Sequence, residues 1–373
     1  MTPSSNSLIH FIREKIAAAG GQLSFDQFMG CALYHPEFGY YNSARFDIGK
    51  EGDFITAPEI SPLFAQCFAR QCLQIWATLP ERTLLELGAG TGRLARDLLN
   101  EFDRLGSPPD HYFIYEPNLG LRKKQQACLP SARVQWLDHL PSEFSGVIVA
   151  NEVLDALPVH CFRIDRDGVK ERCVMWENNE FQWKISVPTS AELREEIVKL
   201  CDLYGLETGY ESEINLNLSP FIQAIAAALK AGAIFFIDYG YGQREYYHPQ
   251  RRQGTLTCFY QHRHHANPLI SVGLQDITAH VDFTRVAESA VQYGCDVLGY
   301  TTQAAFLLAC GLMELAAEAE KNLSAADEFA LHQAIKLLTL PTEMGERIKV
   351  MALGKQLGSP LVGFDLQDRR RDL

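Results

Sequence analysis

The chain has 373 residues, of which 47% are apolar and 21% charged, proportions typical of a globular protein with an ample buried core. Its formal net charge of −12 argues against non-specific binding to nucleic acid phosphates, and it contains no stretch of about 18 uncharged apolar residues that could span a membrane. None of the ten cysteines forms a C-x-x-C pair, so we expect reduced thiols in a cytoplasmic protein rather than a disulfide framework or a zinc ribbon.

The first segment, residues 1–61, is expected to be helical and then loop-like. Residues 7–19 mix apolar and charged positions as an amphipathic helix does. Residues 52–61 form an irregular loop that glycine and proline interrupt. A helix over residues 62–79 then leads into the first strand, and we assign residues 62–160 to the first half of the core.

A glycine-rich turn follows the first strand. Residues 83–87 form an apolar strand that contains Glu86, and a helix covers residues 95–102. Between them lie Gly88, Ala89, Gly90, Thr91 and Gly92. Because glycine lacks a Cβ, such a turn can adopt positive φ and a ligand can approach its bare backbone.

The spacing of the glycines distinguishes two kinds of ligand. A dinucleotide-binding turn has its third glycine where this chain has Arg93. The pattern Glu-x-Gly-x-Gly-x-Gly instead resembles motif I of the class I S-adenosylmethionine (SAM) methyltransferases. By this resemblance the cofactor-binding residues are Glu86, Gly88, Ala89, Gly90 and Gly92.

The next two strands end in acidic residues. Residues 111–115 form a strand that is followed by Glu116, whose carboxylate can accept both hydroxyls of a ribose. A third strand over residues 133–137 is followed by Asp138. We expect this segment to contact the adenine, with Leu137 or Trp136 covering the ring and Asp138 near the exocyclic amine. The alternative is that Trp136 is simply part of the core.

Further strands alternate with helices along the rest of the chain, which predicts an α/β fold with a doubly wound sheet. A fourth strand covers residues 146–150, and a fifth covers residues 232–239, in the second half of the core at residues 219–373. Candidates for the sixth and seventh strands are residues 295–300 and 347–353.

Three insertions interrupt this pattern and are expected to help form the substrate side of the site. Residues 161–218 contain hairpin-like alternation and a helix, residues 242–283 form a long loop, and residues 303–346 are helical.

Candidate catalytic residues follow the fourth strand. Asn151, Glu152 and Asp155 lie at the sheet edge where ligands bind in open α/β folds. Glu152 and Asp155 would share one face of a first helical turn, where two carboxylates could orient a guanidinium. The alternative is that these acids only complement the positive end of a helix.

The loop after the fifth strand contains further polar groups that could bind a substrate. They are His262, Asp276, His280 and Asp282. Three histidines within residues 262–265 raise the question of a metal, but adjacent side chains seldom converge on one ion, so we expect none.

Several motifs together resemble the MidA family, from about residue 7 to about residue 355. They are residues 52–61, the glycine-rich turn, and residues 150–159, 237–241 and 275–283. The family includes a mitochondrial factor for assembly of respiratory complex I that methylates a protein arginine. The resemblance implies a Rossmann-like class I methyltransferase fold, a seven-stranded, mostly parallel sheet with helices on both faces and large insertions.

The same resemblance implies that SAM is the methyl donor, that S-adenosylhomocysteine is the product and that a protein arginine is the acceptor. It also implies that residues 52–61 close over the methionine end of SAM, with Thr56 and Ser61 as polar contacts and Asn151 reaching the same region. A link to assembly of a respiratory complex follows by the same analogy.

Other interpretations stay open at this point. The chain could methylate a small molecule, or it could be a non-catalytic, SAM-binding assembly factor. An NAD dehydrogenase is disfavoured by Arg93. The sequence leaves a homodimer open.

Overall fold

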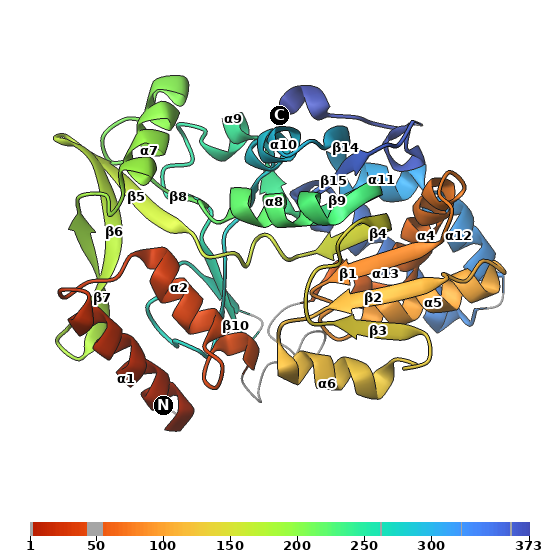
Figure 1. Cartoon of the computed structure of the whole chain (residues 1–373), viewed down its shortest axis with the longest axis horizontal. Helices are drawn as coiled ribbons and strands as arrows, with labels where there is room; N and C mark the ends of the chain where they lie inside the picture. The colour runs from red at the N-terminus through yellow and green to blue at the C-terminus, as the bar shows by residue number, and fades with distance from the viewer. Residues whose placement is uncertain (1–2, 43–54, 262, 322, 359) are drawn as a thin grey trace. The chain divides into compact units, whose positions relative to one another are not determined.

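The computed structural model describes residues 3–42, 55–261, 263–321, 323–358 and 360–373. The chain divides into two compact units, each of which is built from separate segments (Figure 1). The sheet unit comprises Ile55–Leu154, Phe221–Gly240 and Phe283–Leu373, and the accessory unit comprises Met1–Phe54, Asp155–Pro220 and Tyr241–Asp282. His262 and residues 52–54 of the expected closing loop lie outside the described residues.

The main sheet of the sheet unit contains, within the described residues, a path of seven strands in the order β14-β15-β9-β4-β1-β2-β3. The strands are β1 (Thr83–Leu87), β2 (His111–Tyr115), β3 (Val134–Leu137), β4 (Phe144–Asn151), β9 (Leu229–Tyr241), β14 (Asp296–Thr302) and β15 (Ile348–Lys355). Strands β3, β2, β1, β4 and β9 are parallel, whereas β15 is antiparallel to β9 and β14. The predicted mostly parallel sheet is confirmed, with seven strands on this path and β13 paired with β9 outside it.

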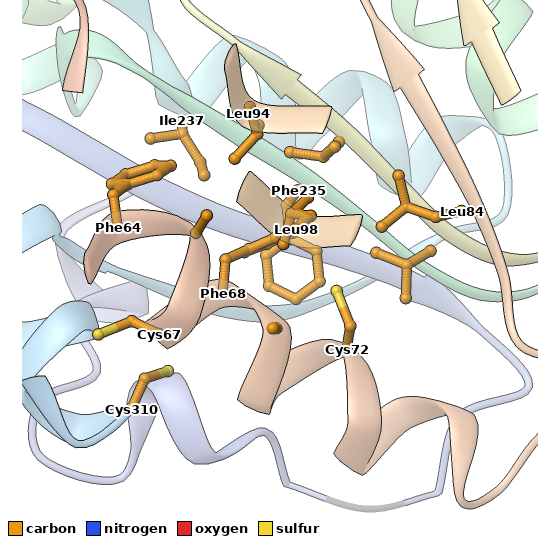
Figure 2. Close-up of a cluster of buried hydrophobic side chains, with 14 of the residues drawn as sticks. Phe64, Cys67, Phe68, Cys72, Leu84, Leu94, Leu98, Phe235, Ile237 and Cys310 are labelled. Carbon is orange, nitrogen blue, oxygen red and sulfur yellow. The ribbon is translucent and has the colours of Figure 1, made fainter. Parts of the chain in front are cut away.

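Helices cover both faces of this sheet. Because successive strand residues point to opposite faces, Val147 and Val149 of β4 join the core cluster on one face, while Ile148 is fully buried on the other. The first cluster includes side chains of α4 (Pro62–Trp76) and α5 (Arg93–Arg104). Figure 2 shows Phe68 of α4 against the strand residue Phe235, and their ring centroids are 5.2 Å apart.

The other helices of this unit follow the predicted alternation. They are α3 (Ala57–Ile60), α6 (Leu119–Cys128), α8 (Leu218–Ala228), α10 (Phe283–Gln292), α11 (Gln303–Ala309), α12 (Leu312–Glu320), α13 (Ala325–Thr339) and α14 (Met344–Arg347), with 3-10 turns at Val362–Phe364 and Arg370–Asp372. The segment predicted to be a helical insertion, residues 303–346, contains α11 to α14.

The accessory unit contains two small antiparallel sheets and its own core. One sheet has the order β7-β6-β5-β8 and the other β11-β10-β12. The strands are β5 (His160–Asp165), β6 (Gly168–Glu177), β7 (Glu180–Ser186), β8 (Glu211–Ile214), β10 (Thr257–Tyr260), β11 (Arg263–His265) and β12 (Asp276–Thr278), and a short β13 covers Val281–Asp282. Phe162, Ile197 and Tyr210 belong to a buried cluster of this unit.

Helices complete the accessory unit. They are α1 (Pro3–Ala18), α2 (Phe25–Tyr34), α7 (Ala191–Tyr204) and α9 (Gln243–Tyr246), with a 3-10 turn at Tyr40–Asn42. Leu23, between α1 and α2, exchanges backbone hydrogen bonds of 2.9 and 2.7 Å with Val174 of β6. The N-terminal helices are thereby attached to the four-stranded sheet. No helix among the residues that the structure describes is long and apolar enough to cross a membrane.

Candidate cofactor and active site

Four strand ends meet at one edge of the parallel sheet. The strand register pairs Leu87 with both Tyr115 and Ala150, and pairs Tyr115 with Leu137. In open α/β sheets, ligands bind beyond this carboxyl edge. The residues that come next in the four strands are Gly88, Glu116, Asp138 and Asn151. The structure therefore aligns the predicted glycine turn, ribose partner, adenine-side acid and post-β4 segment along one edge.

All three glycines of the glycine-rich turn adopt the left-handed backbone region that favours glycine. Gly88, Gly90 and Gly92 have φ values of 64°, 53° and 81°. A residue with a Cβ loses roughly 1–2 kcal/mol in this left-handed region. Gly92 is also the N-cap of α5, and its N–H donates to the carbonyl of the buried Ala89 over 2.8 Å. The bare backbone of the three glycines and the first N–H groups of α5 thus lie together at the sheet edge, as in sites that bind a ligand at a helix N-terminus.

The segments that contact this turn include α3 and the residues after β4. The hydroxyl of Thr91 donates a hydrogen bond to the carboxylate of Glu59 in α3. A Cβ on Gly88 would lie 3.1 Å from Cγ2 of Val153, which follows β4. Since α3 ends the 52–61 stretch, the described part of the expected closing loop does lie beside the glycine turn.

Thr56 and Ser61 bracket α3. Thr56 is its N-cap and makes no side-chain capping bond. Ser61 is buried and caps α4, since its Oγ accepts the N–H of Leu63 over 3.2 Å. Ser61 therefore has a structural function in α4, and contacts of either residue with a cofactor stay predictions.

Glu86 is buried one residue before the end of β1. Burial raises its pKa to about 7, although the hydroxyl of Tyr112 donates to its Oε2 over 2.6 Å and opposes the shift; the nearby Glu116 raises the pKa further. Burial and the Glu86 carboxylate likewise raise the pKa of Tyr112 well above its ordinary value. The two side chains form a pair in which Glu86 can change protonation near neutral pH.

Glu116 is held by two neutral donors. Its Oε1 accepts the backbone N–H of Asn118 over 3.0 Å, and its Oε2 accepts Nε2 of Gln125 over 3.1 Å. Burial raises its pKa, and these two hydrogen bonds oppose the shift. Because each carboxylate oxygen has two acceptor positions, both oxygens keep capacity for a ribose hydroxyl.

The segment after β3 is arranged differently from the expectation for an adenine site. Asp138 is exposed and pairs with Arg122 of α6 over 2.5 Å, so its carboxylate already has a partner. Arg122 also donates to the carbonyl of Trp136 over 3.2 Å. Leu137 is half-buried at the strand end. Adenine contacts of Leu137 and Asp138 stay predictions.

The segment after β4 is not the helical turn that the sequence suggests. No helix occurs between β4 and β5, and Glu152 has a left-handed φ of 51°. Its N–H donates to the carbonyl of Ile237 over 2.8 Å. The expectation that Glu152 and Asp155 share a helix face is therefore wrong, because this contact with β9 fixes an irregular turn.

Asp238 stabilises this turn and was not among the predicted site residues. Its buried Oδ2 accepts the N–H groups of Val153 and Leu154 over 3.1 and 2.8 Å. Its Oδ1 accepts the N–H of Tyr239 over 2.8 Å. A carboxylate at the end of the fifth strand was visible in the sequence, but no local signal indicated which backbone it would bind.

Asn151 presents an unused acceptor at the sheet edge. Its Nδ2 lies 3.4 Å from Oε1 of Glu152, whereas its buried Oδ1 has no hydrogen-bond partner among the described residues. A buried carbonyl oxygen without a donor is costly, so this atom fits a ligand that brings an N–H group. Asn151 Oδ1 thus suits the ammonium group of SAM, and Glu116 suits its ribose. The bare backbone of the glycine turn lets the cofactor approach closely.

The accessory unit contains the other predicted catalytic residue, Asp155. It is buried, and its backbone carbonyl accepts the N–H of Ala279 over 3.0 Å. Asp276 is buried too and accepts the hydroxyl of Tyr41 over 2.8 Å. Burial, Asp276, Tyr34 and Asp155 all raise the pKa of Tyr41. The predicted residues Asp155 and Asp276 thus belong to one acidic, tyrosine-lined cluster, and the sequence did not indicate the two tyrosines.

His280 and Asp282 have partners of their own in the accessory unit. The His280 ring lies 5.2 Å from that of Tyr241, and the backbone N–H of His280 donates to Thr255 Oγ1 over 3.0 Å. Asp282 accepts Nε2 of Gln243 over 2.9 Å. Among the residues that are described, no group of three or more His, Cys, Asp or Glu side chains could hold a metal ion.

Comparisons with known proteins give a consistent result. Residues 67–301 match the model of a family described as S-adenosyl-L-methionine-dependent methyltransferases. The protein arginine methyltransferase NDUFAF7 homolog of Drosophila melanogaster is 29% identical over 96% of this chain and 88% of its own length. The human protein arginine methyltransferase NDUFAF7 is 27% identical over 95% of this chain and 83% of its own length; both names include the word mitochondrial.

A solved structure is similar along the whole chain. A Burkholderia thailandensis protein crystallised with S-adenosyl-homocysteine has a TM-score of 0.94 and 39% identity, with 100% of this chain and 99% of that one covered. A second crystal structure from the same organism has a TM-score of 0.91 and 38% identity, again over 100% and 99% of the chains.

Proposed function

We propose that this chain, which belongs to the family of S-adenosyl-L-methionine-dependent methyltransferases, methylates the guanidinium of a protein arginine. Membership of this family identifies SAM as the methyl donor. The relatives named as protein arginine methyltransferases support arginine as the methyl acceptor. The two insertions of the accessory unit, which are absent from a minimal α/β sheet, favour a bulky acceptor.

The observation that carries this proposal is the geometry of Glu152. A non-glycine residue at a φ of 51° is strained by roughly 1–3 kcal/mol, and such strain is concentrated at functional sites. The strain is maintained by the bond from its N–H to Ile237 and by Asp238. Glu152 thereby occupies the first position beyond β4, directly after Asn151, and the next residue, Val153, lies beside Gly88 of the glycine turn.

The chemistry needs few protein groups. When bound, SAM supplies an electrophilic methyl carbon on a positively charged sulfur. An arginine nitrogen forms the new N–C bond while the C–S bond breaks with its electron pair on sulfur, and one N–H proton leaves to a carboxylate or to water. Glu152 would bind the guanidinium through its fork of donors and hold the nitrogen lone pair toward the methyl group.

The acids of the accessory unit provide a second part of the proposal. Asp155 and Asp276 are both buried and interact electrostatically with Tyr41. A negative, partly aromatic environment favours a cationic arginine over a neutral acceptor. We therefore assign Asp155 to acceptor binding, with Asp276 supporting it.

The experiment is transfer of labelled methyl from SAM into proteins of a cell lysate, followed by mass spectrometry of the modified residues. The wild-type chain should produce methylarginine, and Glu152→Gln and Asp155→Asn should each reduce the label at least tenfold. Glu143→Gln is a matched control, because Glu143 also has a positive φ, of 56°, but is exposed at the other end of β4. Its label should match the wild type.

Other results would favour other functions. Label on small molecules alone would identify a small-molecule methyltransferase. No enzyme-dependent label, with cellular function retained in Glu152→Gln and lost in Gly90→Val, would identify a non-catalytic binding factor. The cytoplasmic location and the homodimer stay predictions.

A further inference from the structure

We infer that Gln125 is a positioning residue for the methyl donor, because its side-chain amide joins the glycine turn, the ribose partner Glu116 and the strand end at Trp136. The inference rests on the proposed ribose-binding role of Glu116. Gln125 lies on α6 and belongs to none of the sequence motifs described above, yet it is completely buried.

The nitrogen and the oxygen of this side-chain amide both have hydrogen-bond partners. Nε2 donates to the carbonyl of Gly90 over 2.9 Å and to Oε2 of Glu116 over 3.1 Å. Oε1 accepts Nε1–H of Trp136 over 3.0 Å. The reverse orientation of the amide would place its oxygen against two acceptors and its nitrogen against a donor. The network therefore allows one orientation only.

This orientation has a consequence for Glu116. With Asn118 on one carboxylate oxygen and Gln125 on the other, the plane of the carboxylate is fixed before a ligand arrives. A fixed pair of acceptors can receive two ribose hydroxyls without the entropic cost of ordering the Glu116 side chain at binding. Neither donor is charged, so neither neutralises the carboxylate.

The same amide couples two parts of the cofactor site. Its bond to the Gly90 carbonyl acts on the centre of the glycine turn, where φ is 53°. Its bond to Trp136 acts on the segment expected to face the adenine. Losing the amide would thus loosen the turn, the ribose partner and the adenine side together.

The test is calorimetric titration of S-adenosylhomocysteine into the wild type, Gln125→Met, Glu116→Ala and the double variant. Methionine keeps the length of the side chain and removes both donors. We expect Gln125→Met to weaken binding about tenfold, the effect of leaving buried polar groups unpaired. In the Glu116→Ala background the same substitution should weaken binding less than it does in the wild type, because the part of its effect that passes through Glu116 is already lost.

Gln126→Met is the matched control, since Gln126 is the neighbouring glutamine on α6 and is exposed. It should bind like the wild type. Melting curves without ligand separate folding from binding: a purely structural role would lower the melting temperature of Gln125→Met but leave the affinity per folded molecule unchanged.

The experiment distinguishes a failure of the ribose-binding role of Glu116 from a failure of the positioning role of Gln125. If Glu116→Ala binds with wild-type affinity, the ribose assignment is wrong and the inference with it. If Glu116→Ala binds weakly while Gln125→Met binds normally, or if Gln125→Met costs the same in both backgrounds, only the positioning role of Gln125 is overturned.

Discussion

The buried carboxylate of Asp238 at the end of β9 accepts a hydrogen bond of 2.8 Å from the backbone N–H of Leu154. Together with the bond to Val153, this contact shapes the turn that contains Glu152. The candidate catalytic residue is therefore held by a residue 84 positions from Leu154 in sequence.

Asp238→Asn should destabilise the fold and reduce methyl transfer. Asparagine has one acceptor oxygen, so either the N–H groups of Val153 and Leu154 or that of Tyr239 meet an NH₂ group. We expect a loss of about 1–3 kcal/mol in unfolding free energy, measured by urea denaturation. Asp110→Asn is the control: Asp110 accepts the N–H of Arg82 over 2.9 Å but is exposed, so water can replace the bond. Equal stability of Asp238→Asn and wild type would contradict the account.

Gly90→Val should abolish SAM binding, because a branched side chain would block approach to the backbone of the turn. Gly106→Val is matched to it: Gly106 has a φ of 62° and open space around its Cα, but lies after α5. Both variants should lose roughly 1–2 kcal/mol of stability from the left-handed φ. Only Gly90→Val should lose calorimetric binding of SAM, and a similar loss in both would indicate a general folding defect.

Thr91→Val should weaken SAM binding about three- to tenfold, since it removes the hydrogen bond that joins the glycine turn to Glu59 of α3. Thr91→Ser keeps the hydroxyl and should bind nearly as the wild type does. Equilibrium binding of SAM to the two variants distinguishes them. Equal affinities would show that the hydrogen bond between Thr91 and Glu59 does not contribute to SAM binding.

Stability should depend on pH through Glu86. Its pKa is raised by burial from 4.5 to about 7. Between these values the folded protein keeps a proton that the unfolded chain has released. The stabilisation is thus complete below pH 4.5 and is lost as pH rises through about 7, with a slope of at most about 1.4 kcal/mol per pH unit. Urea denaturation at several pH values should show this slope, and Glu86→Gln should remove it.

We also expect Glu86 to release a proton when SAM binds. The sulfonium charge of SAM favours the ionised form of Glu86, whereas S-adenosylhomocysteine has no such charge. Calorimetry at pH 7 in buffers of different ionisation enthalpy should therefore detect more proton release with SAM. An identical difference in Glu86→Gln would assign the proton to another group.

The sequence was a good guide where structure is local. Apolar runs bounded by glycine or an acid located β1, β2 and β4, and the alternate glycines correctly indicated positive φ at Gly88, Gly90 and Gly92. These features depend on a few neighbouring residues, so the local sequence pattern is sufficient to predict them.

Features that depend on distant contacts could not be predicted. The turn at Glu152 looked helical because its backbone partners, Ile237 and Asp238, come from another strand. Gln125 and Gln126 are indistinguishable in the sequence, yet only Gln125 is buried within the cofactor site. Tyr41 pairs with Asp276, which is 235 residues away.

The most direct test of the proposed function is single-turnover methyl transfer by Glu152→Gln to an arginine-containing acceptor, measured together with its dissociation constant for SAM. Glutamine preserves the size of the side chain but removes its charge. We expect SAM affinity within about threefold of the wild type and a transfer rate lower by at least about 100-fold, since Glu152 would act on the acceptor rather than the donor. An unchanged transfer rate at saturating SAM would contradict the assignment of Glu152.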